Sequence, residues 1–209
     1  MTPQDNAYAA FMLDHAAGLL PPAESLVADL HVALSTEGSR YAGMLDSAGG
    51  ALLESVEPEL VAVGPFHQRN GASPREQEAP AAMISSSRLA PHLDADLLAL
   101  RWRRDIAGVP TYRTNIPMLR LLRLDPGERA PGHSHGRRDV TVVLKGAFAD
   151  ENGLYEKGDL AFAMPGLRHQ PRAVGVEPCV CMVATERGRP VRGLLGLFGI
   201  GVGKLEKRT

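Results

Sequence analysis

The feature that most constrains this chain is a group of histidine and acidic residues in its second half. His133, His135 and Asp139 are all odd-numbered, so on an extended segment their side chains would project from one face. His169 follows a Pro-Gly turn, which could begin a neighbouring strand and bring a fourth side chain to the same place. Three imidazoles and one carboxylate suit a divalent cation such as zinc, iron, nickel or manganese. The pattern predicts a metal site made by these four residues; the alternative is a polar strand edge with solvated histidines.

The chain from Leu97 onward is typical of a β-protein. Its apolar or alternating runs are LALRWRR, TYRTNIP, MLRLLRL, VTVVLKGAF, DLAFAM, CVCMVAT and the terminal GLLGLFGI. Turn sequences such as DPGE (125–128), ENG (151–153) and KGD (157–159) separate them. About seven short strands, with no helical pattern between them, predict a closed antiparallel barrel or a double-sheet roll.

The N-terminal part of the chain has a helical pattern instead. Residues 7–20 are good helix formers, and a second helix is expected to begin at Pro21-Pro22. A third helix is expected from about Glu37 to Ser55, capped by Ser35 or Thr36. Its apolar stripe comprises Tyr41, Met44, Leu45, Ala48 and Leu52. These helices predict a small bundle with a shared apolar seam, although a bundle this small could also offer part of the stripe to a partner.

Charge and composition divide the chain into two units. Residues 1–60 contain nine acidic residues and one basic residue, Arg40, whereas basic residues are in excess afterwards. We therefore predict a helical domain at 1–62, a polar linker rich in proline and glycine at 63–90, and a β-domain at 91–209. The acidic unit would repel nucleic acid and could attract a basic protein; the alternative is a solvated acidic surface.

The cysteine count and the hydropathy pattern limit the remaining classes of protein. Cys179 and Cys181 should share one face of a strand and pack as small hydrophobic residues; a zinc or redox role is the alternative. No apolar run is long enough to span a bilayer. The N-terminus has neither a basic residue before Arg40 nor an apolar core segment, so no secretory signal is expected. These observations predict a cytoplasmic protein without a membrane segment.

Residues 118–169 resemble the cupin superfamily. The first cupin motif matches His133, His135, Asp139 and Gly146, and the second matches Gly158, Pro165-Gly166 and His169. The resemblance implies an all-β cupin domain, a double-stranded β-helix or jelly-roll barrel, that binds one divalent metal through the three histidines and Asp139. Most cupins have glutamate where Asp139 stands. The shorter aspartate requires the metal to shift or to bind a water there.

The whole chain resembles a narrower family, the ChrR-type anti-sigma factors. The similar segments are AAGLLP (16–21), LHVALSTEGSR (30–40), GGALLE (49–54), the pair Arg101-Trp102, and VVLKGAF (142–148). In that family the helical N-terminal domain holds an extracytoplasmic-function sigma factor away from RNA polymerase. The cupin domain is needed to release the sigma factor under stress, such as singlet oxygen or organic peroxide. The resemblance implies the same partner here, with zinc as the expected cupin metal.

One departure from that family concerns a second zinc site in the helical domain. The family's ligand positions match Asn6, His31, Ser35 and Gly38, of which only His31 could hold zinc. We therefore expect no zinc in this domain, and we expect His31 to be a cap or surface histidine. A structural zinc stabilises small domains strongly. Its absence must be offset by the helical seam or by contact with the cupin.

Two other functions compete with a regulator. The same four ligands around Fe(II), Mn(II) or Ni(II) could serve a dioxygenase or isomerase, with Arg113, Arg120 or Arg123 binding a substrate carboxylate. A cupin that only binds a sugar or another small molecule is the third reading, because cupins support many functions. For the regulator we expect no direct contact with nucleic acid, and a homodimer through cupin sheet edges is the default oligomer.

Overall fold

The computed structural model describes residues 3–57 and 97–186. The predicted linker at 63–90 and the predicted terminal strand GLLGLFGI lie outside these ranges, and the domain boundaries stay predictions. Three helices come first: α1 (Pro3–Ala16), α2 (Pro22–Leu34) and α3 (Thr36–Glu54). After a 3-10 turn (Leu97–Ala99) the described strands are β1 (Arg103–Arg104), β2 (Pro110–Arg113), β3 (Leu119–Leu124), β4 (His133–Ser134), β5 (Asp139–Lys145), β6 (Ala147–Asp150), β7 (Gly153–Glu156), β8 (Leu160–Ala163), β9 (Arg168–His169), β10 (Arg172–Val174) and β11 (Cys179–Thr185).

The helices begin and end close to the predicted positions. The first helix starts and stops four residues earlier than the predicted 7–20. The second begins with Pro22 in its first turn, where a missing backbone N–H costs nothing. Ser35 caps α3 as predicted: its side-chain oxygen accepts a hydrogen bond from the backbone N–H of Gly38. Local sequence signals therefore account for the helical region.

The strands form two larger sheets that face each other. One sheet has six strands in the order β1-β2-β3-β11-β5-β8, and the other has three in the order β10-β6-β7. The run VTVVLKGAF was expected to be one strand but supplies β5 to the first sheet and β6 to the second. Gly146 makes the corner between them, with φ 64° and with room for no side chain, since a Cβ would lie 2.6 Å from the Pro178 carbonyl oxygen.

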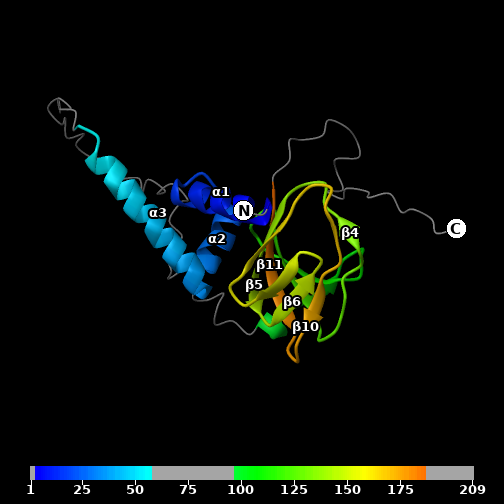
Figure 1. The fold of residues 1–209 in the computed structure, drawn as a ribbon. Helices are drawn as coiled ribbons and strands as arrows, with labels where there is room; N and C mark the ends of the chain where they lie inside the picture. The colour runs from blue at the N-terminus through cyan, green and yellow to red at the C-terminus, as the bar shows by residue number, and fades with distance from the viewer. Residues whose placement is uncertain (1–2, 58–96, 187–209) are drawn as a thin grey trace, which may run out of the picture.

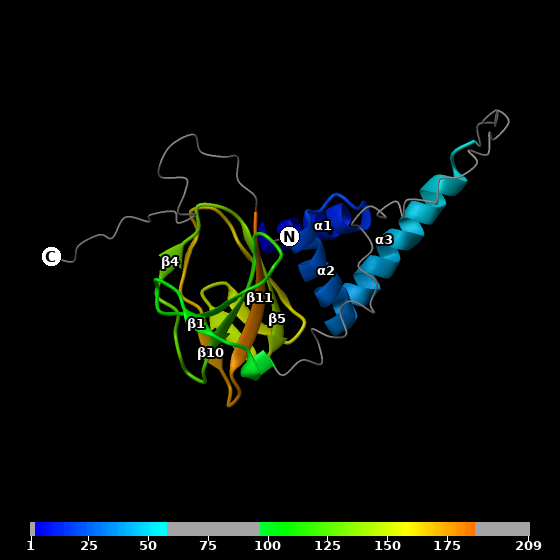
Figure 2. The same ribbon diagram turned by 180° about the vertical axis from the view of Figure 1, so that it is seen from behind.

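The central strands of the six-stranded sheet, β5 and β11, are buried on both faces. The sheet's inner face, with Val143 and Cys181, packs against Phe148 and Ala173 of the three-stranded sheet to fill the barrel. Its outer face packs against α1 and α2, which lie beside the barrel in Figures 1 and 2. This second core includes Phe11, Leu30, Leu121, Val142 and Met182. The predicted order, a small helical region followed by an all-β barrel of two facing sheets, is confirmed.

Strand β11 shows why the sequence there is apolar at every position. Cys179 and Cys181 belong to the barrel interior, whereas Val180 and Met182 belong to the core shared with the helices. Such continuous apolar runs are expected where a strand is covered on both sides. Both cysteines are buried, with their sulfur atoms 3.5 Å apart, so the prediction that they pack in the core is confirmed.

Helix α3 shares only part of its predicted apolar stripe with the other helices, which is the alternative that the sequence left open. Only its N-terminal part packs on the other helices, through residues such as Tyr41 and Leu45, and the rest extends away from the barrel (Figure 1). Leu52 of the predicted stripe lies in this extended part and is exposed, and Met44, beside the packed part, is exposed as well. None of the described helices combines the length and apolar character required to cross a bilayer.

His31 also differs from its expected place. It is only 3% exposed and lies on the face of α2 that packs on the turn after β7, so it is neither a surface nor a capping residue. Its Nδ1 lies 2.7 Å from the carbonyl oxygen of Gly158, and its Nε2 lies 3.0 Å from the hydroxyl of Tyr8. Sequence reasoning missed this role because the barrel residue that covers His31 is far away in the chain.

Candidate metal centre

The three motif histidines reach one place through a short two-stranded sheet. Strand β4 pairs antiparallel with β9, and this register sets His133 directly opposite His169. His135 follows at the end of β4 and forms a bridge with Pro165, and the N–H of Gly166 donates to the carbonyl oxygen of His135 at 2.9 Å. The predicted Pro-Gly turn therefore brings the third histidine across to the first two, as the spacing indicated.

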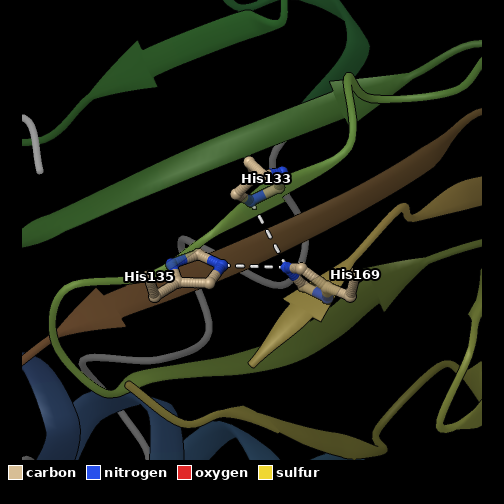
Figure 3. A group of neighbouring side chains, drawn as sticks. All are labelled: His133, His135 and His169. Carbon is tan, nitrogen blue, oxygen red and sulfur yellow. Dashed lines mark hydrogen bonds between the residues drawn. The ribbon is translucent and has the colours of Figure 1, made fainter. Parts of the chain in front are cut away.

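The Nε2 atoms of the three histidines converge. The Nε2 of His169 lies 2.8 Å from that of His135 and 3.3 Å from that of His133. Figure 3 shows the three rings pointing toward one another. The candidate ligand atoms all lie within 4.8 Å of one another. Ligands about 2.0–2.1 Å from a tetrahedral zinc would be spaced by similar distances.

The contacts of the three Nδ1 atoms indicate which ring nitrogens are free to bind a cation. The Nδ1 atoms of His133, His135 and His169 face the carbonyl oxygen of Pro131 and carboxylate oxygens of Asp139 and Asp150. These partners only accept hydrogen bonds, so each Nδ1 carries the proton and each Nε2 presents a lone pair. Three converging lone pairs repel one another unless a cation lies between them. The donor set therefore fits a divalent metal, with the outer partners orienting the rings.

Asp139 lies beside this group rather than within it. Its Oδ2 is 3.2 Å from the Nδ1 of His135 and 2.8 Å from a guanidinium nitrogen of Arg120. Burial alone would raise the pKa of Asp139, but the hydrogen bond from His135 and the charge of Arg120 lower it below its usual value. In this arrangement the carboxylate holds the ring of His135. Direct ligation of a metal by Asp139 stays a prediction.

Asp150 is a member of the site that sequence reasoning missed. Its Oδ2 lies 2.9 Å from the Nδ1 of His169, at the end of β6. Burial alone would raise its pKa, whereas hydrogen bonds from His169 and the N–H of Asn152 lower it, so the carboxylate is charged. No motif spacing points to this residue. The corner at Gly146 brings β6 past the histidines, and only the folded barrel reveals it.

The arginines considered for substrate binding are engaged elsewhere. Arg120 pairs with the buried Asp139 and also donates to the hydroxyl of Thr185 at 2.6 Å. Arg123 pairs with Asp125 on the surface, and Arg113 is exposed at the end of β2. Of the three, only Arg120 lies at the centre, and its charge is used to hold Asp139.

The two-sheet barrel and its three converging histidines are those of a cupin. Residues 114–188 match the family described as the ChrR cupin-like domain. The chain is 33% identical to the anti-sigma-E factor ChrR of Cereibacter sphaeroides, over 89% of this chain and 91% of that protein. It also resembles the crystal structure of Rhodobacter sphaeroides SigE in complex with the anti-sigma ChrR, with 31% identity and a TM-score of 0.64. That likeness covers 85% of this chain and 96% of the other.

Identity of this extent, over both the helical and the barrel regions, shows the family. This protein belongs to the ChrR-type anti-sigma factors, as the sequence motifs indicated.

Proposed function

We propose that this protein is an anti-sigma factor that binds an extracytoplasmic-function sigma factor through its helical region, in the cytoplasm. The observation that carries this proposal is the likeness, over most of the chain, to the structure of a ChrR protein bound to SigE. The relative of 33% identity is also an anti-sigma factor. The helices are included in both likenesses, and they form the part of the chain for which a protein partner has a physical rationale.

Helix α3 supplies that rationale. Leu52 and Leu53 are 68% and 76% exposed, and Val56, just after the end of the helix, is also exposed. An isolated helix of this length is marginally stable in water, because most helical stability in proteins comes from packing an apolar face. Neighbouring exposed apolar side chains are a feature of protein interaction surfaces. We therefore propose the far half of α3 as the surface that the sigma factor covers.

The charge of the helical region suits the same partner. Residues 3–57 contain eight acidic residues and one basic residue. A sigma factor binds DNA and therefore carries basic surfaces. An acidic, partly apolar helix can compete for such surfaces and cannot bind nucleic acid itself, since like charges repel. Charge complementarity therefore supports a sigma factor rather than DNA or RNA as the partner.

The helical positions that match the zinc ligands implied by the family resemblance have other contacts here. Of the matching positions, Asn6 is exposed, Ser35 caps α3, Gly38 has no ligand atom, and both ring nitrogens of His31 face protein partners. We infer that packing of α2 on the barrel, together with the His31 contacts, stabilises the helices without a metal. A homodimer through a cupin sheet edge stays a prediction.

We propose that the cupin domain binds one divalent metal, with zinc as the first choice, and that this centre controls release of the sigma factor. Three neutral imidazoles suit zinc, and they leave one tetrahedral position for water or a small reactive molecule. Iron, manganese and nickel accept the same donors. A metal supplies a reactive centre there, while His133, His135 and His169 hold it and Asp139 and Asp150 orient two of the rings.

The test is co-purification of the full chain with an extracytoplasmic-function sigma factor expressed from the same genome. The wild-type protein should retain the sigma factor, and the variant Leu52→Lys/Leu53→Lys should retain at least tenfold less. Val176→Lys, at an exposed position of the barrel, is the matched control and should bind normally. If folded, metal-loaded protein retains no sigma factor, the function is wrong. Equal binding by all three proteins would place the docking surface outside the far half of α3.

A further inference from the structure

A buried ion pair joins the helical region to the barrel. Glu24, in the first turn of α2, is only 2% exposed, and its carboxylate accepts a hydrogen bond from the guanidinium of Arg138. Burial raises the pKa of Glu24, with Arg138 acting in the opposite direction. A buried carboxylate is strongly unfavourable without its partner, because no water replaces the lost contact. The position of Arg138 therefore affects how well α2 packs on the sheet.

Arg138 belongs to the segment that carries a candidate metal ligand. It is followed directly by Asp139, whose carboxylate contacts the Nδ1 of His135. The segment 135–138 links β4 to β5, so a ligand stands at one end and the Glu24 partner at the other. The Arg138 carbonyl also accepts a hydrogen bond from the N–H of Glu186, just after β11, at 2.9 Å. That bond anchors the Arg138 carbonyl to the end of β11, while the peptide bond to Asp139 would transmit a shift of Asp139 or His135 to the Arg138 side chain.

We propose that the Glu24–Arg138 pair couples the three-histidine centre to the packing of α2 against the barrel. The inference rests on the proposed metal site. While the rings of His133, His135 and His169 are held together, the segment 135–139 keeps Arg138 on Glu24. When the rings separate, Asp139 and Arg138 lose their fixed position, Glu24 loses its buried partner, and the N-terminal half of α2 leaves the sheet.

A second contact makes this opening one-sided. His31, near the C-terminal end of α2, packs on the turn between β7 and β8, 2.7 Å from the Gly158 carbonyl oxygen. The helix approaches closely there: a Cβ on Gly158 would lie 2.8 Å from the Leu34 carbonyl oxygen. Neither residue contacts the three histidines. We therefore expect metal removal to release the Glu24 end of α2 and to leave the His31 end attached.

Hydrogen exchange of the full chain tests the coupling. Protein loaded with Zn(II) is compared with the same protein after dialysis against a chelator, and zinc content is measured in every sample. In the wild type, amides in the first half of α2 should exchange at least tenfold faster after zinc is removed. Amides near His31 should change less than threefold.

Two variants separate coupling from general loosening. Glu24→Leu/Arg138→Met replaces the pair with apolar side chains, so α2 should stay packed in both states and the zinc effect on exchange should fall below twofold. Glu24→Gln serves if that variant fails to fold: it keeps a hydrogen-bonding group, removes the charge, and should also reduce the zinc effect. Arg123→Met breaks an exposed ion pair of the same barrel and should leave the tenfold effect intact.

Several results would overturn the inference. Zinc removal could leave exchange in α2 unchanged in the wild type, or it could accelerate exchange equally in the wild type and the apolar variant. Failure of folded wild-type protein to bind zinc would remove both the metal site and the coupling. None of these results depends on sigma binding, which the co-purification with Leu52→Lys/Leu53→Lys tests separately.

Discussion

Substituting Gly38 with alanine should destabilise the protein, although alanine is the better helix former. An added Cβ would lie 2.6 Å from Nε2 and 2.7 Å from Cδ2 of the His31 ring, which is closer than real contacts allow. The ring cannot swing away freely, because it is buried and both of its nitrogens face partners, on Tyr8 and on Gly158. The methyl group must therefore displace the ring or push α3 away from α2.

The expected cost follows from these contacts. Two lost hydrogen bonds account for about 1 kcal/mol each, and overpacking of a buried site adds roughly 1–3 kcal/mol. The helix propensity of alanine offsets at most about 1 kcal/mol. The net loss should be about 2 kcal/mol or more in the free energy of unfolding, which is a fall of about 4–8 °C in Tm for a chain of this size.

The matched control is Gly49→Ala in the same helix, where an added Cβ meets no atom within 4 Å. That variant should gain up to about 1 kcal/mol from propensity alone. Both are measured by urea and thermal unfolding, followed by circular dichroism. If Gly38→Ala is as stable as Gly49→Ala, the argument that the His31 ring fills the space over Gly38 is refuted.

Three further predictions concern the metal centre, pH and the thiols. His169→Ala should abolish stoichiometric zinc binding, whereas Asp139→Ala should weaken zinc binding about 10–100-fold if the carboxylate acts only by holding His135. Competition with a chromophoric chelator measures both affinities. Complete loss of zinc binding in Asp139→Ala would show that Asp139 is a direct ligand. Burial raises the pKa of Asp29 to about 6. Its contribution to stability is therefore present at low pH and lost as pH rises through about 6, so Asp29→Asn should stabilise the protein by roughly 1–2 kcal/mol at pH 7.5 and by little at pH 4.5, measured by urea unfolding. Cys179 and Cys181 should resist alkylation until the protein unfolds, because both are buried and the pKa of Cys181 is raised by its hydrogen bond with Cys179 and by burial. Mass spectrometry measures alkylation of the native protein over time. Alkylation at the rate of a free thiol would contradict this prediction.

Much of the candidate site could be predicted because its signals are local. His133 and His135 alternate as in a strand, and the Pro-Gly turn before His169 starts another short strand, so the sequence indicated both strands although not their long-range pairing. The three histidines indeed converge. The groups that contact the Nδ1 atoms of the histidines could not be predicted, because Asp150 and the carbonyl of Pro131 follow no spacing rule. Their roles depend on the fold of the barrel around the histidines.

The helical region shows the same division. Pro22 and the Ser35 cap allowed the starts of α2 and α3 to be predicted from the sequence, because each signal acts within a few residues. Which face of each helix is covered depends on the barrel, and so His31 was expected as a cap or surface residue but is buried. The stripe on α3 illustrates the reverse error. A helical spacing of apolar residues cannot distinguish a face that packs within the chain, near Leu45, from one left uncovered, near Leu52.

The core that α1 and α2 share with the outer face of the six-stranded sheet has a practical consequence for dividing the chain. A fragment beginning at the predicted boundary, 91–209, would expose Leu121, Val142 and Met182, all of which the helices now cover. Apolar patches of that kind promote aggregation in isolated fragments. The cupin domain produced alone should therefore be poorly soluble, and addition of a separate peptide containing α1 and α2 should increase its solubility. We therefore expect the boundary between the two units to mark a change of secondary structure, and we do not expect the barrel to fold well without the helices.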